Sequence, residues 1–304
     1  MSDTSLTPVF PHRHVPLEGP GAPRMAGALE LAAPLALGQR GLVIAPPVSG
    51  ATTVLQWLGA AVARELPAAE IHVVLVDRPV EERLEWREAL PTATIHGTTS
   101  EVEGPEEHVA LAAPFIAGAA AARLGRDVVL LVDSLAAFAR ALAATRGAGD
   151  ERVLDGGFPQ VAMRELRGLF GLARATAGSD GGSLTIIATV QVETAQQLDE
   201  LVLHELVGTG NVEWRLDREA FRAGMFPPVD VLASGARRTE DIVGVAEADR
   251  RGAVRALVDA RGTVPGLMTL LDSLDEAGSL ARVLDDPWLL SRGGDDAAPP
   301  SWPT

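Results

Sequence analysis

The sequence predicts an α/β domain in which helices flank a mostly parallel sheet, and three observations lead to that fold class. First, near-continuous aliphatic segments alternate with longer helical patterns along most of the chain. Strands that are apolar on both faces are typical of parallel sheets covered by helices on both sides. Second, the 304 residues are 47% hydrophobic and 22% charged, which suits a large buried core. Third, the first strong strand runs into a short small-residue loop and then a helix, the layout of a phosphate-binding loop.

The expected elements follow in order from the N-terminus. A segment rich in proline, glycine and histidine predicts an extended lead over residues 1–24. Aliphatic runs predict strands over residues 41–45, 71–77, 92–96, 128–133, 184–190 and 211–216. Helical patterns cover residues 53–65, 108–124, 135–144, 160–175 and 197–206, and a helical C-terminal part covers about 239–286. The last residues, 293–304, predict a disordered tail. Residues 25–292 then form one domain.

The predicted phosphate-binding loop lacks its usual cation. Strand 41–45 leads into the sequence Pro46-Pro47-Val48-Ser49-Gly50-Ala51-Thr52-Thr53. In a working loop of this kind, the residue before the Ser/Thr is a lysine that reaches the β- and γ-phosphates. Here that residue is Ala51, and the chain contains no lysine, so all 26 Lys+Arg residues are arginine. Backbone N–H groups still predict an anion site, and the alternative interpretation is an ordinary strand-to-helix turn.

A second candidate is the strand 128–133, which ends in Asp133. An aspartate at the carboxyl edge of the sheet lies beside the phosphate-binding loop, where it helps to hold Mg²⁺. The same residue type also caps the helix that follows such a strand. Both roles remain open for Asp133 on the sequence alone.

Composition limits the classes of partner and the cellular location that we expect. The net charge is −15 and the pI is near 4.8, which argues against RNA and DNA as partners, since nucleic-acid binders usually carry a basic surface. The chain has no cysteine and shows no metal-ligand spacing among its histidines. With no signal pattern and no apolar run of membrane-spanning length, the expected location is the cytoplasm, without membrane attachment.

The order of motifs resembles one family, the ATPase domain of the bacterial transcription termination factor Rho, a ring-shaped RNA translocase. The matching stretches are Leu6-Thr7-Pro8, Gly38-Gln39-Arg40-Gly41, Val132-Asp133-Ser134, Phe138-Ala139-Arg140-Ala141, Val153-Leu154-Asp155-Gly156-Gly157, Gly182-Ser183-Leu184-Thr185, Gly208-Thr209-Gly210-Asn211, Phe226-Pro227 and Ser234-Gly235-Ala236-Arg237. The resemblance implies a RecA-like domain over residues 25–292. Leu6-Thr7-Pro8 resembles the linker after Rho's RNA-binding domain, so we expect that domain to be absent.

The resemblance also assigns roles to the nucleotide site. The nucleotide-binding positions are Pro47, Ser49, Gly50, Thr52, Thr53, Asp133 and Phe226. Thr52 and Asp133 are the Mg²⁺ ligands of the family, relevant here only if nucleotide binds. The lysine of the loop falls on Ala51. The family's water-activating carboxylate precedes an Arg-Pro pair, but here Asp77 runs directly into Arg78-Pro79, so that carboxylate is missing.

Of the other functional residues that the resemblance implies, some are retained and some are lost. Phe226 takes the place of the aromatic residue that stacks on adenine, and Arg237 that of the arginine that reaches a neighbouring subunit's ATP. A second arginine of the family falls on Gly224, and a pore lysine falls on Gln197. The other pore loop, around residues 148–157, is acidic here.

These losses predict a Rho-like pseudo-ATPase, a non-catalytic scaffold or regulatory subunit with no catalytic residue expected and with weak nucleotide binding at most. ATP or ADP with Mg²⁺ are the candidate ligands. The expected partners are further copies in a ring or filament, or a Rho-type protein. Two alternatives stay open: a divergent active ATP-dependent RNA translocase and transcription terminator, in which Arg78 contacts phosphate, and a nucleotide-sensing binding module without hydrolysis.

Overall fold

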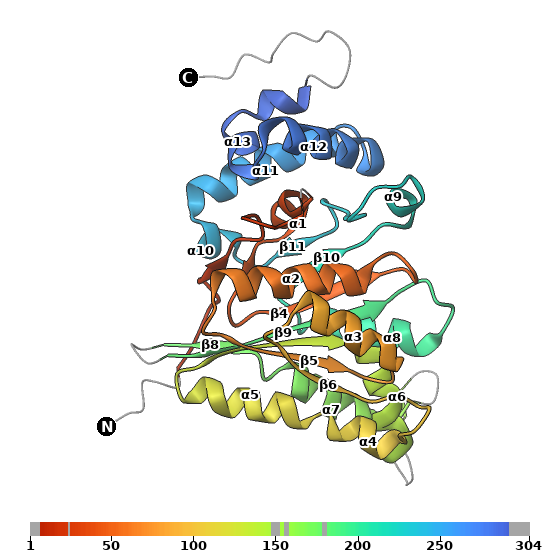
Figure 1. The fold of residues 1–304 in the computed structure, drawn as a ribbon. Helices are drawn as coiled ribbons and strands as arrows, with labels where there is room; N and C mark the ends of the chain where they lie inside the picture. Colours follow the sequence, from red (N-terminus) through yellow and green to blue (C-terminus); the bar gives the residue numbers. More distant parts are fainter. Residues whose placement is uncertain (1–6, 24, 147–152, 155–157, 178–180, 292–304) are drawn as a thin grey trace.

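The computed structural model describes residues 7–23, 25–146, 153–154, 158–177 and 181–291. The expected tail at 293–304 lies outside the described residues, as does most of the expected pore loop at 148–157. One nine-stranded sheet forms the centre of the molecule, and helices lie on both of its faces (Figure 1). This is the predicted α/β architecture with a mostly parallel sheet and a helical C-terminal part.

Six strands form the parallel part of the sheet. In spatial order they are β10 (Val212–Arg215), β4 (Arg40–Ala45), β9 (Ser183–Gln191), β7 (Asp127–Asp133), β5 (Glu70–Leu75) and β6 (Thr94–Gly97). Antiparallel additions are β11 (Gly235–Ala236) beside β10, β8 (Arg174–Thr176) beside β9, and β1 (Pro8–Val9) beside β8. A separate pair joins β2 (His14–Val15) to β3 (Leu35–Ala36).

Helices cover both faces because successive strand residues point in opposite directions. One face of β4 and β7 carries Val43, Ala45, Val129 and Leu131, which pack under α1 (Ala26–Ala32), α2 (Ala51–Glu65) and the C-terminal helices. The C-terminal helices are α10 (Thr239–Val243), α11 (Val245–Asp259), α12 (Thr263–Ala277) and α13 (Leu280–Asp285), followed by a 3₁₀ turn at Pro287–Ser291.

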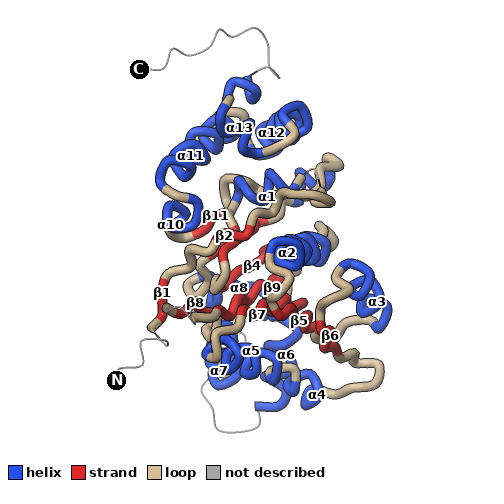
Figure 2. The backbone as a smooth tube through the Cα atoms, turned by 60° about the vertical axis from the view of Figure 1, so that its left-hand side comes forward, coloured by secondary structure: helices blue, strands red, loops and turns tan. Residues whose placement is uncertain are grey.

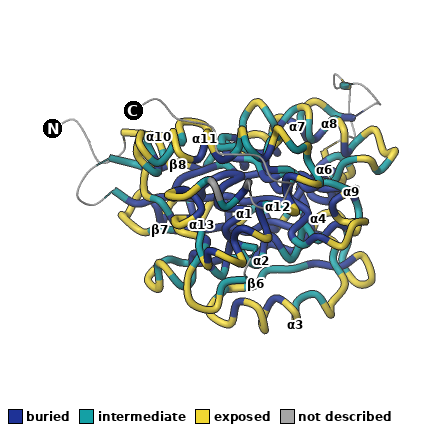
Figure 3. Tube along the Cα trace, turned by 90° about the horizontal axis from the view of Figure 1, so that it is seen from above, coloured by how far each residue is buried: buried dark blue, intermediate teal, exposed yellow. Residues whose placement is uncertain are grey.

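The opposite face carries Leu42, Ile44, Leu130 and Val132. These residues pack against α5 (Ala113–Arg123), α6 (Leu135–Arg146), α7 (Gln160–Phe170) and α8 (Gln197–Val207). Strands β4 and β7 are accordingly almost wholly buried, whereas the edge strand β6 is mostly of intermediate burial and the rim helix α3 (Val80–Ala89) is mostly exposed (Figure 3). The remaining helices are α4 (Pro105–Ala110) and α9 (Arg218–Arg222).

Two helix expectations from the sequence are wrong in detail. The helix expected at 108–124 is two helices, α4 and α5, and α5 begins with Pro114 in its first turn, where a proline starts a helix but does not continue one. The helix expected at 160–175 ends at Phe170, and the residues after it form β8, because they pair with the start of β9. In the lead segment, Pro8–Val9 and His14–Val15 form the strands β1 and β2 (Figure 2).

Among the described residues, no helix is both long and apolar enough to cross a membrane. Within the same residues, no group of three or more histidine, aspartate and glutamate side chains could hold a metal ion.

Candidate nucleotide site

The predicted phosphate-binding loop lies where the sequence places it, between the end of β4 at Ala45 and the start of α2 at Ala51. Two positive φ angles shape it, 63° at Val48 and 88° at Gly50. The Ser49 hydroxyl donates a hydrogen bond of 2.6 Å to the Pro46 carbonyl and holds the turn closed. The first N–H groups of α2 have no partner within the helix, so they favour an anion at this end.

Phe226 packs directly against this loop. A Cβ added to Gly50 would lie closer than 3.0 Å to the Phe226 ring, so the backbone can approach the ring only because residue 50 is glycine. The ring also meets Trp57 of α2 edge-on, with 5.2 Å between the ring centroids. The structure therefore brings the expected adenine platform to the expected loop, although these two residues are about 175 positions apart in the chain.

Asp133 is the most heavily bonded side chain of the site. It is fully buried at the end of β7. The hydroxyls of Thr52 and Thr189 each donate a hydrogen bond of 2.7 Å, one to each carboxylate oxygen. The guanidinium of Arg78 donates from Nη2 to Oδ1 and forms an ion pair with it. Three protein donors thus bond to the carboxylate that the family resemblance assigns to Mg²⁺.

Arg78 projects from the segment between β5 and α3. Burial alone would lower its pKa, but the Asp133 carboxylate, with smaller contributions from Glu82 and Asp77, outweighs burial and raises the pKa. The side chain is one-quarter exposed, and its Nε lies 3.7 Å from the Glu82 carboxylate. A fixed positive charge therefore stands next to Thr52 and Asp133, although it does not come from the loop itself.

Glu82 and Thr189 are site residues that the sequence reasoning missed. Burial raises the pKa of Glu82, and Arg78 offsets this only in part. Thr189 stands out, in retrospect, as a hydroxyl near the end of an otherwise aliphatic strand. The signal for Glu82 is its position four residues after Arg78 in the first turn of α3, where side chains at i and i+4 meet.

Asp77, the carboxylate nearest the missing general base, turns away from the loop. Its Oδ1 accepts hydrogen bonds from the N–H and the hydroxyl of Ser100, which lower its pKa. Its φ is 54°, so the strand stops before it and the chain changes direction there. Asp77 is therefore held by the loop after β6 and is not available beside Thr52.

Arg237 does not lie at this chain's own loop. Its backbone N–H donates to the Asn211 carbonyl, near β10 and β11, and its side chain is exposed at the amino end of β4. Gly224 has a φ of 80° with open space around its Cα, and Gln197 begins α8.

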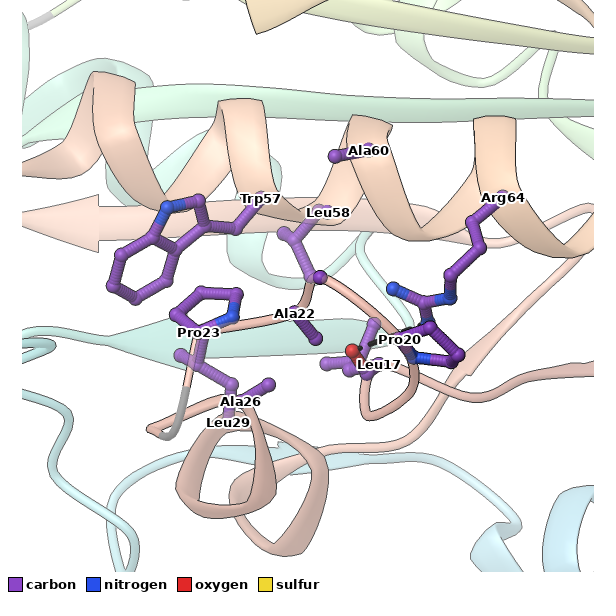
Figure 4. Close-up of a pocket in the computed structure, with 11 residues that line it drawn as sticks. Leu17, Pro20, Ala22, Pro23, Ala26, Leu29, Trp57, Leu58, Ala60 and Arg64 are labelled. Atoms are coloured by element: carbon purple, nitrogen blue, oxygen red, sulfur yellow. Dashed lines mark hydrogen bonds between the residues drawn. The ribbon is translucent and has the colours of Figure 1, made fainter.

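Two cavities adjoin this region. One of about 530 Å³ lies beside the loop residues Pro47, Val48 and Ser49 and reaches α9 and the end of β9. The other, of about 380 Å³, is apolar and lies between α2, α1 and the Pro20–Pro23 turn (Figure 4). Trp57 lines the second cavity from α2, but none of the predicted site residues does, so it belongs to helix packing and not to the phosphate site.

Comparison with known proteins agrees with this architecture. Residues 26–236 match the model of the ATP synthase alpha/beta family, nucleotide-binding domain. The transcription termination factor Rho of Streptomyces coelicolor is 41% identical over 271 residues, which cover 88% of this chain and 64% of that protein. Rho of Streptosporangium roseum is 38% identical over 283 residues, covering 92% of this chain and 71% of that protein.

Solved structures show the same fold. An ATPase from the type III secretion system of pathogenic bacteria superposes with a TM-score of 0.71 at 22% identity, over 96% of this chain and 82% of that one. The assembled ATPase EscN of enteropathogenic E. coli gives 0.69 at 22% identity, over 92% and 69%. The chain spans only 64% and 39% of the first two Rho proteins it matches. By fold and by sequence, the chain belongs to the ATP synthase alpha/beta nucleotide-binding family and, within it, to the Rho proteins.

Proposed function

We propose that this chain is a Rho-type nucleotide-binding domain that does not hydrolyse ATP and acts as a scaffold or regulatory subunit. One observation carries the proposal. The buried carboxylate of Asp133 is already satisfied by Thr52, Thr189 and the Arg78 guanidinium. A metal ion at Asp133 would have to displace a paired cation, and no lysine follows Gly50 to hold the phosphates.

The expected loss in hydrolysis rate is larger than the expected loss in nucleotide affinity. A charge-assisted hydrogen bond to phosphate contributes about 1.5–3 kcal/mol, so its loss weakens binding roughly 10- to 100-fold. The absence of a placed general base lowers a rate by roughly two to four orders of magnitude. Backbone donors of the loop and the Phe226 platform remain, which supports weak nucleotide binding without chemistry.

The test is a phosphate-release assay with Mg-ATP, with and without RNA, alongside calorimetric titration. We expect the wild-type rate to equal that of Asp133→Asn, the matched variant that removes the metal-binding carboxylate. Turnover in the wild type that Asp133→Asn abolishes would refute the proposal. Micromolar binding without turnover would favour a nucleotide-sensing module, and no binding at millimolar nucleotide would leave a scaffold alone.

The exposure of the Arg237 side chain indicates which partners to propose. This side chain is free to serve a neighbouring subunit while this chain's own loop carries Ala51. We therefore propose self-association, or insertion into an assembly of a Rho-type partner. Co-purification with tagged Rho checks the second case, and a reproducible absence of association would remove it.

One observation favours a second candidate, a divergent active ATPase. Glu82 is a carboxylate of raised pKa beside Arg78, so the pair offers a base and a cation near Thr52. This candidate predicts turnover that Glu82→Gln abolishes and Glu85→Gln, an exposed change on the same helix, leaves intact. The relatives are named for transcription termination, so RNA is included as a stimulator in that assay.

A further inference from the structure

A cavity rich in arginine lies at the other end of the sheet from the phosphate-binding loop. Its volume is about 310 Å³, and it is lined by Pro8, Val9, Phe10, Pro11, Gly38, Arg40, Arg174, Asn211, Arg237 and Arg238. Gly38 and Arg40 stand at the start of β4, whereas the phosphate-binding loop follows its end. A six-residue strand separates them by roughly 20 Å, so this arginine cavity is a separate site.

The cavity concentrates positive charge in a chain whose net charge is −15. Among the described residues, no aspartate or glutamate lines it. Burial lowers the pKa of Arg40, and the like charges of Arg174 and Arg237 lower it further. Several arginines elsewhere pair with carboxylates, as in the Arg13–Asp127 pair at 2.8 Å. Gathering guanidinium groups without counter-charges is unfavourable until an anion enters, which is the electrostatic pattern of an anion site.

Hydrogen bonds hold Arg40 in place, bind Arg174 only weakly and, in the described structure, leave the Arg237 side chain free. Arg40 donates to the Thr209 carbonyl at 2.7 Å and to the Ala173 carbonyl at 2.9 Å, which holds its guanidinium in place. Arg174 makes only long contacts of 3.3 and 3.4 Å to backbone carbonyls. In the described part of the chain, the Arg237 side chain has no hydrogen bond or ion pair, so all its donors are available.

One wall of the cavity is apolar. Phe10 is 61% exposed, and Pro8 and Pro11 flank it in the lead segment. The Arg238 guanidinium lies 4.0 Å from the Phe10 ring centroid and also pairs with Asp241 at 2.6 Å, so it holds the ring in position and is itself neutralised. A ligand with an anionic group and a flat organic part would find complementary surfaces for both.

We propose that the arginine cavity binds a small phosphate-bearing ligand, whose phosphate or pyrophosphate group lies between Arg40, Arg174 and Arg237 and whose organic part, where present, packs on Phe10. The forked donors of arginine match phosphate oxygens in pairs. A volume of about 310 Å³ lies at the lower end of the range for small-molecule sites, which suits a single phosphate ester or pyrophosphate.

Calorimetric titration of the full chain with pyrophosphate, and separately with ADP, in EDTA tests this site. Arg174→Gln and Arg237→Gln should each weaken pyrophosphate binding about 10- to 100-fold, the effect of losing one charged contact to phosphate. Arg146→Gln is the matched control, an arginine of similar exposure that pairs with Glu165. Ala51→Glu places a repelling charge at the phosphate-binding loop and should leave pyrophosphate binding unchanged.

Two features make the result decisive. The Arg237 side chain has no partner in the described structure, so Arg237→Gln should unfold at the wild-type temperature, and its oligomeric state is measured beside its pyrophosphate affinity. Tighter binding of ADP than of pyrophosphate, reduced by Phe10→Ala, would identify the organic part as a base. Equal affinities would point to the phosphate group as the whole ligand, which also supports the site.

Four outcomes would overturn the proposal. The first is no binding of pyrophosphate at millimolar concentration, and the second is a loss of pyrophosphate affinity in Arg146→Gln equal to that in Arg237→Gln. The third is a loss of binding in Ala51→Glu but not in Arg237→Gln. The fourth is a change in oligomeric state in Arg237→Gln with unchanged pyrophosphate affinity. The third would place the anion at the phosphate-binding loop. The fourth would make this face a contact between copies of the chain. Neither depends on whether the phosphate-binding loop supports hydrolysis, so the proposed function is tested separately.

Discussion

Replacing Arg78 by alanine should destabilise the protein by about 3 kcal/mol, because it leaves a buried carboxylate without its counter-charge. Asp133 has no exposed surface, and the Arg78 side chain is one-quarter exposed. Removing one partner of a buried ion pair costs roughly 3–5 kcal/mol, and the remaining hydroxyls of Thr52 and Thr189 place the effect at the lower end. With an unfolding entropy of about 2.1 cal/mol/K per residue, the loss corresponds to a fall in Tm of about 5 °C.

Chemical denaturation of the wild type, Arg78→Ala, Asp133→Asn and the double variant measures this pair. We expect Asp133→Asn to rescue much of the loss, since it removes the unpaired charge, and the double-variant cycle to give an interaction energy above about 1 kcal/mol. Arg146→Ala, which breaks the exposed pair with Glu165, is the control and should change stability by less than about 1 kcal/mol. A loss in Arg78→Ala no larger than this control would show that Arg78 does not neutralise Asp133.

The remaining predictions concern charge and backbone. Nδ1 of His72 lies 3.1 Å from Nε2 of His96. Burial lowers the pKa of both rings below 6.5, and the charge of His96 lowers that of His72 further. The folded state therefore favours neutral rings, so the free energy of unfolding should be constant above pH 6.5 and fall as pH drops below it. Equal slopes in wild type and His72→Gln in denaturation series would contradict this. Gly38→Ala should destabilise more than Gly50→Ala, because an added Cβ meets the β8 backbone at Gly38 but only the Phe226 ring at Gly50. Thermal unfolding ranks the two, and the reverse order would refute the reasoning.

Contiguous features of the chain were predictable from sequence. The aliphatic runs at 41–45, 128–133 and 184–190 are strands β4, β7 and β9 within one or two residues. They could be identified because a strand buried on both faces needs apolar residues at consecutive positions. The predicted helix boundaries were wrong at Pro114 and after Phe170, where a proline break and the pairing of β8 with the next strand, β9, outweighed helical periodicity.

The sequence by itself determined the fold class, the family and the absence of lysine at position 51, because each depends only on the identity and order of residues along the chain. Only the tertiary structure decided how the remaining charges are used. Arg78 and Asp133 are 55 positions apart, and the arginines of the cavity come from three separate segments. Their encounters depend on strand order and on the turn at Asp77, and electrostatic interactions follow distance in space, which local patterns do not encode.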